Sequence, residues 1–223
     1  QINIQQFPTV RARLLTFDKN GTFIPHTAST LRLKENGNSN VITSVTCNNT
    51  SSSQPISVAI GIDASVSMNY AEQLDSPLQL TFTSVNTLLS RVQHNESEFT
   101  LQTSDAIPQI IQDATTIRSN ISTGLTTIKT TSGNNFSQQL LHPVTGLIAV
   151  ASALHNKKVI LFCTDGRYGV LPEADVLQCI TLCRLQNITF CSLIYTSPNT
   201  DATGLRTSLR TIADSTGGYI FEN

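Results

Sequence analysis

The sequence predicts an α/β protein with a doubly wound, mainly parallel sheet flanked by helices and preceded by a small β-rich segment. Two apolar runs, residues 56–62 and 157–163, have the composition of short strands that are buried on both faces. Between and after these runs, strand-like and helical patterns alternate, which is the order of elements in doubly wound sheets. With 223 residues, 39% of them hydrophobic, the chain can form one ample domain and a small companion.

The β-rich segment is expected to comprise residues 1–54. Its polar end, residues 48–54, has the composition of a linker, so we place the domain boundary there and assign residues 55–223 to the second domain. Turns at residues 18–21 and 35–38 separate its short strands. The strands themselves are expected at residues 10–17, 22–26, 30–34 and 40–47.

The second domain is expected to alternate helices with further short strands. Apolar residues recur at helical spacing in five segments, residues 77–92, 116–129, 136–154, 173–186 and 205–213. Short strands are expected at residues 98–103, 109–112, 188–195 and 217–221, the last at an edge of the sheet. Pro143 lies inside the third helical segment, where it is expected to kink the helix or to delay its start.

Polar side chains follow the first apolar run directly. Asp63, Ser65 and Ser67 stand on alternate residues, so a tight loop after the strand can bring their side chains together. One carboxylate and two hydroxyl oxygens suit Mg²⁺, Mn²⁺ or Ca²⁺ and suit zinc poorly. The sequence therefore predicts a hard-cation site at this strand end.

A second polar group follows the other apolar run. Thr164, Asp165 and Gly166 end the run at residues 157–163, and the carboxyl ends of strands are where open α/β sheets place their ligands. Between the two runs, residues 132–135 form a polar turn that precedes a helical pattern. We expect these groups to meet at one edge of the sheet.

These motifs, in this order, resemble the von Willebrand factor A-type (VWA) domain and its metal-ion-dependent adhesion site (MIDAS). The resemblance covers roughly residues 55–223. The family's Asp-x-Ser-x-Ser and Thr-Asp-Gly motifs are both present, whereas its third loop, usually Gly-Gly-Thr-Asn, reads Ser-Gly-Asn-Asn here. An Asn thus replaces the metal-coordinating Thr, and an amide oxygen is an acceptable ligand for Mg²⁺ or Ca²⁺. The implied metal ligands are Asp63, Ser65, Ser67, Asn134 and Asp165.

The resemblance implies a function in binding. In the family, the open coordination position of the metal is taken by an Asp or Glu side chain of a partner protein, so the metal acts as an electrostatic clamp. We therefore expect a secreted or surface-exposed adhesion module that forms part of a larger surface protein. The segment of residues 1–54 in turn resembles the immunoglobulin-like or related modules that often accompany such domains on bacterial surfaces.

Residues close to the two motifs are candidates for the binding surface. Tyr70 and Met68 follow the first motif, although Met68 could equally pack beneath the loop. Arg167 and Tyr168 follow the second motif, and we expect them on the same rim as exposed contact residues.

Composition argues against several other classes of protein. A net charge of −1 with scattered Lys and Arg argues against a nucleic-acid or anionic-membrane partner. No apolar run approaches the roughly 20 residues that are needed to span a bilayer, so no membrane insertion is expected. The chain is rich in Ser, Thr and Asn and begins with Gln1 instead of Met, as expected of a mature exported protein. A trimmed chain would also begin in this way.

Cysteine chemistry adds little to this picture. The five cysteines, Cys47, Cys163, Cys179, Cys183 and Cys191, leave an odd thiol, so a complete set of disulfides within the chain is excluded. Most are expected to be buried free thiols, with a bridge between Cys183 and Cys191 as the alternative.

Catalysis is not expected. The four histidines are scattered, and the chain contains neither a Gly-x-Ser-x-Gly nucleophile motif nor a glycine-rich phosphate-binding motif. Two alternatives to the adhesion module are kept. One is a structural or assembly module whose degenerate site no longer binds metal, which Asn134 favours. The other is a hydrolase that polarises its substrate with the metal, against which the lack of a base near the motif argues.

Overall fold

The computed structural model describes residues 2–3, 11–12, 16, 24, 26–46, 54–70, 75–104, 107–131, 133, 135–167, 169–195 and 203–222. The chain divides into two compact units, residues 1–52 and residues 53–223. Each unit is described by itself.

The larger unit contains a six-stranded sheet in the order β10-β9-β8-β5-β6-β7. All neighbouring strands are parallel except β6 and β7, which are antiparallel. This arrangement confirms the predicted mainly parallel α/β class. The strands are β5 (Ile56–Asp63), β6 (Glu98–Ser104), β7 (Gln109–Thr115), β8 (Lys157–Thr164), β9 (Thr189–Ile194) and β10 (Ile220–Glu222).

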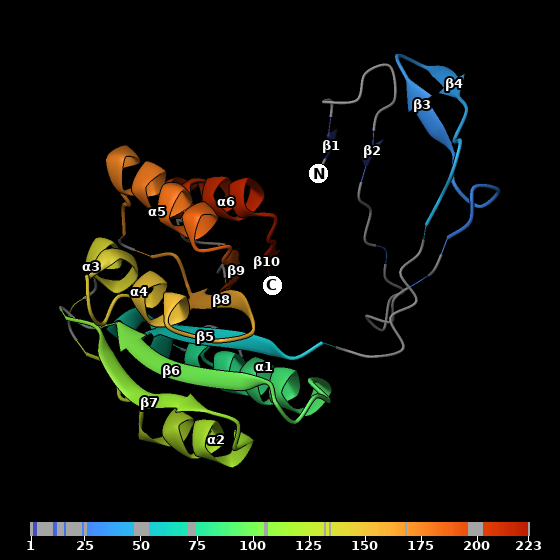
Figure 1. The fold of residues 1–223 in the computed structure, drawn as a ribbon. Coiled ribbons are helices and arrows are strands. Elements are labelled where there is room, and N and C mark those ends of the chain that lie inside the picture. Colours follow the sequence, from blue (N-terminus) through green and yellow to red (C-terminus); the bar gives the residue numbers. More distant parts are fainter. Residues whose placement is uncertain are drawn as a thin grey trace. The chain divides into compact units, whose positions relative to one another are not determined.

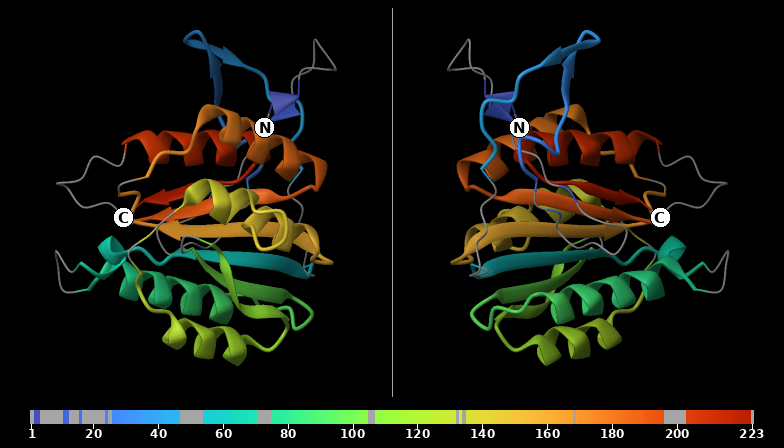
Figure 2. Two further views of the ribbon diagram at one scale, coloured as in Figure 1. Left: turned by 90° about the vertical axis from the view of Figure 1, so that its left-hand side faces the viewer. Right: turned by 90° about the vertical axis from the view of Figure 1, so that its right-hand side faces the viewer.

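Helices cover both faces of this sheet (Figures 1 and 2). α1 and α2 pack on one face, and α3, α4, α5 and α6 pack on the other. The central strand β5 supplies both cores, because Val58 and Ile60 face α1 and α2 while Ala59 faces the opposite layer. The helices are α1 (Pro77–Arg91), α2 (Arg118–Thr127), α3 (Phe136–Leu141), α4 (Leu147–Ser152), α5 (Glu173–Leu185) and α6 (Thr203–Thr216), with a short 3-10 helix η1 (Val66–Asn69) after β5.

The helical segment predicted at residues 136–154 forms two helices, α3 and α4. Pro143 lies in the break, where it cannot donate the backbone hydrogen bond that a continuous helix requires. The connecting loop is closed locally, because the amide of Thr145 donates to His142 Nδ1 at 3.1 Å and the amide of Gly146 donates to the carbonyl of His142 at 2.9 Å. A Cβ at Gly146 would lie 2.5 Å from the backbone of His142, so this tight turn requires glycine.

The helix α1 begins at a well-formed cap. Ser76 accepts a hydrogen bond from the amide of Gln79, the side chain of Gln79 accepts one from the amide of Ser76, and Pro77 occupies the first helical position. The predicted start of this helix at residue 77 is confirmed.

The smaller unit contains two short antiparallel pairs in its described part. β1 (Ile2–Asn3) pairs with β2 (Arg11–Ala12), and β3 (Leu33–Glu35) pairs with β4 (Asn38–Asn40). The predicted turn at residues 35–38 is confirmed, since Asn36 and Gly37 have φ angles of 50° and 84°, as a tight hairpin turn requires.

Among the other predictions for the smaller unit, one is wrong in part and others are not tested by the described residues. The strand predicted at residues 40–47 is wrong for residues 41–46, which lie outside any strand. The turn predicted at residues 18–21 lies outside the described residues. Among residues 26–46 none is buried, so the hairpin of β3 and β4 owes little to a core. The resemblance of this unit to immunoglobulin-like modules stays a prediction.

The four described cysteines are free thiols. The predicted alternative of a bridge between Cys183 and Cys191 is therefore wrong, and Cys47 lies outside the described residues. Burial raises the pKa of the Cys183 thiol to about 12 and raises the pKa values of Cys163 and Cys179 as well. Protonated buried thiols are poor nucleophiles and poor metal ligands, so these side chains serve the core.

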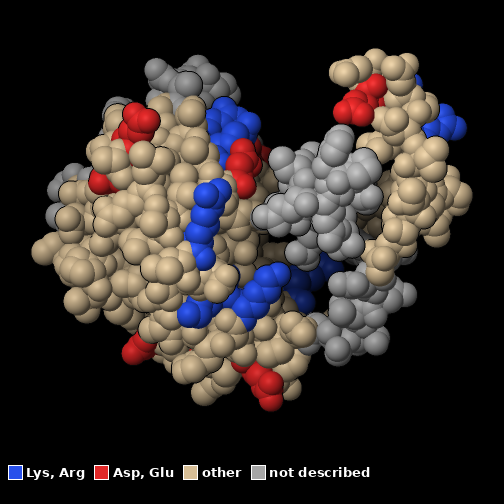
Figure 3. All heavy atoms as spheres, turned by 45° about the horizontal axis from the view of Figure 1, so that its top comes forward, with Lys and Arg blue, Asp and Glu red and all other residues tan. Residues whose placement is uncertain are grey.

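Among the described residues, none of the helices combines the length and the apolar composition that crossing a membrane requires. Figure 3 shows the charged side chains of the larger unit in small separate groups on a largely uncharged face. This distribution on the visible face agrees with the scattered charges of the sequence.

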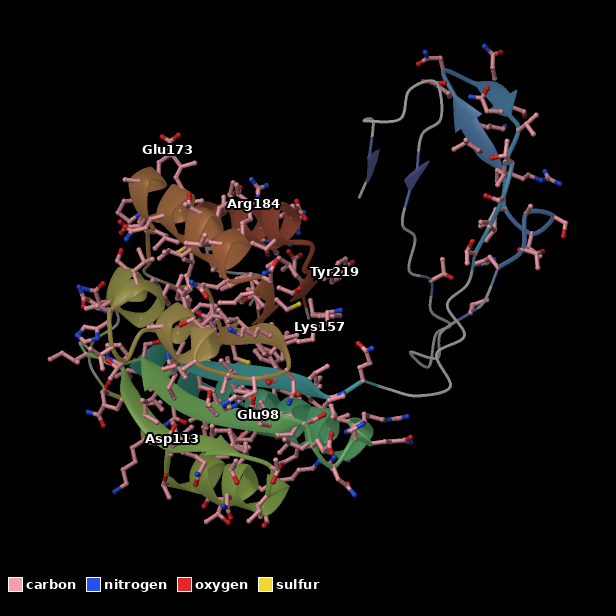
Figure 4. The ribbon with its side chains drawn as sticks, viewed as in Figure 1. Glu98, Asp113, Lys157, Glu173, Arg184 and Tyr219 are labelled. Carbon is pink, nitrogen blue, oxygen red and sulfur yellow. The ribbon has the colours of Figure 1, made fainter. Side chains whose placement is uncertain are left out.

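Glu98, the first residue of β6, connects the amino ends of β6, β5 and β8 through hydrogen bonds. It is 9% exposed, and its carboxylate accepts hydrogen bonds from Ser57 Oγ on β5 at 2.6 Å and from the amide of His155 before β8 at 2.6 Å. Burial raises the pKa of Glu98, but the hydrogen bonds from Ser57 and His155 outweigh it, so that the pKa is lowered from its ordinary value of 4.5. This carboxylate therefore stabilises the amino ends of these strands, whereas the candidate site lies at their carboxyl ends (Figure 4).

Replacing Glu98 should destabilise the larger unit. Glu98→Gln is expected to lower the free energy of unfolding by about 1–3 kcal/mol at neutral pH, because an amide group would face donors that need an acceptor. A carboxyl group whose pKa is lowered on folding contributes stability above its ordinary pKa of 4.5, and this contribution is lost as the pH falls through the lowered value. Urea unfolding at several pH values should show the difference between the parent and the variant shrinking below pH 4.5. The exposed neighbour Glu96 provides the control Glu96→Gln, and an equal loss in both variants would contradict this role.

Candidate functional site

The candidate site lies at the carboxyl ends of β5 and β8, two neighbouring parallel strands. Their register pairs Ile62 with Cys163, so Asp63 and Thr164 end the two strands side by side. Figure 4 helps to locate this edge, because Lys157 marks the amino end of β8 and Glu173 marks the start of α5, which follows the carboxyl end of β8. The prediction that both motifs meet at one edge of the sheet is confirmed.

Asp63 is fully buried and is held from two sides. Its Oδ1 accepts a hydrogen bond from the amide of Ser65 at 2.9 Å, and its Oδ2 accepts one from Thr164 Oγ1 at 2.7 Å. Thr164 Oγ1 in turn accepts a hydrogen bond from the amide of Gly166 at 2.9 Å. The Thr of the second motif thus positions the carboxylate of the first, a role that its place in the motif alone did not reveal.

The two serines of the first motif face each other. Ser65 Oγ and Ser67 Oγ lie 3.0 Å apart, and both residues are buried. Two hydroxyl oxygens at this distance can serve as neighbouring ligands of one ion or can hydrogen-bond to each other, as they do here.

Thr131, directly before the third loop, pairs with the first motif through its backbone. The amide of Thr131 donates to the carbonyl of Ala64 at 2.7 Å, and Ser65 and Thr131 form a parallel bridge. Asn135 caps α3, since its side chain accepts a hydrogen bond from the amide of Gln138 at 3.0 Å. Asn134, the fifth predicted ligand, lies outside the described residues, so its place in the site stays a prediction.

Asp165 is also fully buried, and its two oxygens have different surroundings. Oδ1 accepts a hydrogen bond from the amide of Arg167 at 3.0 Å. Within the described structure Oδ2 has no hydrogen-bond partner, and it lies 3.6 Å from Arg167 Nε. Gly166, with a φ of 72°, provides the sharp turn between these two residues.

The position of Arg167 corrects the prediction that it is an exposed contact residue. Its side chain is 8% exposed and is paired with Asp165. The sequence contained a signal for this pairing. A single glycine separates Asp165 from Arg167, and a turn at that glycine lets the arginine side chain fold back onto the carboxylate. Exposure itself could not be inferred from residue type.

The other residues near the motifs separate into core and surface. Met68 is fully buried, so it packs beneath the loop, whereas Tyr70 is 54% exposed. Val66 and Val170 are also exposed, and Tyr168 lies outside the described residues. Exposed apolar side chains therefore follow both motifs in the sequence.

Negative charge at this edge is only partly compensated. Burial raises the pKa of Asp63 above its ordinary value of 3.8, and the charge of Asp165 raises it further, although hydrogen bonds from Thr164 and Ser65 lower it. The ionised form of Asp63 is thus disfavoured in the folded protein, and a nearby positive charge would stabilise it.

The donor set fits a hard divalent cation. It combines two carboxylates and two hydroxyl groups, and one carboxylate oxygen, Asp165 Oδ2, is buried without a hydrogen-bond partner in the part of the chain that is described. The described residues contain no group of three or more His, Cys, Asp or Glu side chains that could hold a metal ion. A cation at this edge would therefore depend on the serine hydroxyls as well as on Asp63 and Asp165.

Similar solved structures identify the fold. The SpRpn10 VWA domain matches 77% of this chain and 88% of that chain, with 13% sequence identity and a TM-score of 0.59. The three N-terminal domains of the type V pili tip protein Mfa5 from Porphyromonas gingivalis match over 75% of this chain and 47% of that chain, with 12% identity and a TM-score of 0.58. Proximal thread matrix protein 1 from the mussel byssus, in a structure with a zinc-occupied MIDAS motif, matches over 76% of this chain and 41% of that chain, with 13% identity and a TM-score of 0.54.

The chain has the fold of VWA domains, as the resemblance of its motifs predicted. At these identities the structural similarity establishes the fold alone. No protein-family model matches the sequence, and no curated protein matches it either.

Proposed function

We propose that this chain is a binding module that recognises a partner protein through a divalent cation at the edge formed by β5 and β8. The observation that carries the proposal is the buried pair of Asp63 and Asp165, next to two facing serine hydroxyls, with one carboxylate oxygen free of hydrogen bonds among the described residues. Asn134 completes the predicted ligand set.

Each residue of the site has a distinct part in this proposal. Asp63 and Asp165 balance the charge of a divalent ion, while Ser65 and Ser67 add neutral oxygen ligands. Thr164 holds Asp63 in place through its hydrogen bond of 2.7 Å. A bound cation would supply an open coordination position that attracts an anionic oxygen from outside, which is the chemistry of an acidic side chain on a partner protein.

The surroundings of the site support a protein ligand. Val66 within the first motif, and Tyr70 and Val170 shortly after the two motifs in sequence, are exposed, and apolar and aromatic side chains are the residue types that form contacts around a central polar anchor. The similar structures include a byssus matrix protein and a pilus tip protein, which supports a place in an extracellular or surface assembly. The described hydrogen bonds of Asp63, Ser65, Ser67 and Asp165 involve no histidine, and this supports binding rather than hydrolysis.

Titration calorimetry of metal-stripped protein with Mg²⁺ and Mn²⁺ tests the proposal. The parent is expected to bind with a dissociation constant of about 1 mM or tighter, and Asp165→Ala should abolish binding. Asp113 on β7 is an exposed acid of the same sheet, so Asp113→Ala is the matched control and should bind as the parent does (Figure 4). Equal binding by the parent and Asp165→Ala would show that the site is wrongly assigned.

The second candidate function is a structural or assembly module with a degenerate site. Asn134 in place of the usual Thr favours it. If the site is only weakened, Asn134→Thr should increase cation affinity in the same titration. If neither the parent nor this variant binds a cation, the structural module becomes the better assignment.

A further inference from the structure

Arg167 is an unusual residue to find inside this site. Arginine is rarely buried unless it is paired, and its guanidinium group stays charged in proteins. Here the side chain of Arg167 is 8% exposed and lies against Asp165, which is fully buried. The site thus contains a permanent positive charge of its own.

We propose that Arg167 is a built-in counter-ion of Asp165 that competes with a divalent cation for the same carboxylate oxygen. The proposal rests on the cation site proposed above and adds a residue that regulates it. In the metal-free protein Arg167 neutralises Asp165, and in the cation-bound protein the guanidinium group withdraws from Asp165.

The geometry of Asp165 makes these two states exclusive. Oδ1 is fixed by the backbone amide of Arg167 at 3.0 Å, and this bond is compatible with either state. Oδ2 is the oxygen that faces Arg167 Nε, and it is also the oxygen without a hydrogen-bond partner among the described residues. A divalent ion at Oδ2 would meet the positive charge of the guanidinium group at close range in a buried setting, where repulsion is strong.

The pair is also arranged so that it can separate. The distance of 3.6 Å between Arg167 Nε and Asp165 Oδ2 exceeds the usual length of an N–H···O hydrogen bond. The long, flexible side chain of arginine can carry its charged group to solvent while its stem remains packed. Cation affinity should therefore be lower than the oxygen ligands alone would provide, and Asp165 keeps a counter-ion in the metal-free site.

A double-mutant cycle in the presence of EDTA tests the metal-free state without any cation. Thermal or urea unfolding is measured for the parent, Arg167→Gln, Asp165→Asn and the double variant. If the residues form a pair, Asp165→Asn should cost less stability in the Arg167→Gln background than in the parent background. The same cost in both backgrounds would overturn the proposal, whatever the cation does.

Titration with Mg²⁺ and Mn²⁺ tests the competition. Arg167→Gln is expected to bind the cation at least about tenfold more tightly than the parent, because a repelling charge is removed. Arg91→Gln, which changes an exposed arginine on α1, should leave affinity unchanged. Equal affinity of the parent and Arg167→Gln would overturn the proposal and leave the cation site intact, whereas no binding by either protein would overturn the cation site as well.

Discussion

Asp63→Asn is expected to stabilise the metal-free protein at neutral pH and to abolish cation binding. Burial and the charge of Asp165 raise the pKa of Asp63, so its ionised form opposes folding, and an asparagine resembles the protonated acid. Asparagine keeps an oxygen for the amide of Ser65 and a polar group for Thr164. We therefore expect the free energy of unfolding to rise at neutral pH, and Tm to rise by about 2–4 °C for each kcal/mol that is gained.

The pH dependence of this gain has a defined sign. A carboxyl group whose pKa is raised on folding binds more protons in the folded state than in the unfolded state, so metal-free stability falls as the pH rises above 3.8 toward the raised value. The advantage of Asp63→Asn over the parent should therefore be largest at neutral pH and should shrink as the pH falls toward 3.8.

Two measurements on one variant check this prediction. Thermal unfolding in EDTA reports stability, and calorimetric titration with Mg²⁺ reports a loss of affinity of about 100-fold or more, since a ligand carboxylate is removed. Asp113→Asn changes an exposed carboxylate of the same sheet and should alter neither quantity appreciably. A fall in metal-free stability on Asp63→Asn would mean that the carboxylate is a net stabilising group and that the charge at this edge is already compensated.

Phe162→Ala is expected to cost about 3–5 kcal/mol of the free energy of unfolding, the usual range for a large aromatic residue in a core. Phe162 on β8 is fully buried, and its ring lies 6.0 Å from that of Phe136 on α3 and 6.4 Å from that of Phe190 on β9. Its loss would leave a cavity between the sheet and the layer of α3 to α6, next to the strand end that carries Asp165.

Urea unfolding measures this cost, with Phe221→Ala as the control. Phe221 on β10 is 50% exposed, so its replacement should cost far less. If both variants lost similar stability, the packing of Phe162 between β8, β9 and α3 would contribute less to the free energy of unfolding than its burial indicates.

Several features of the fold were predictable because they depend on residues that are close in sequence. The apolar runs of β5 and β8 identified strands buried on both faces, and the capped start of α1 and the Asn36–Gly37 turn were local signals. The antiparallel pairing of β7 was also accessible, since so short a connection after β6 permits only a hairpin. The sequence alone thus determined the α/β class, the order of most elements in the larger unit and the edge at which Asp63 and Asp165 lie.

Only the tertiary structure decided how the charges at that edge are arranged. Residue type indicated that Arg167 is exposed, whereas the glycine turn and the surrounding core bury its side chain against Asp165. The hydrogen bond from Thr164 to Asp63 joins residues 101 positions apart, and Glu98 finds its donors 41 and 57 positions away. Burial and such long-range contacts follow from the packing of the whole chain, and local patterns of sequence do not contain them.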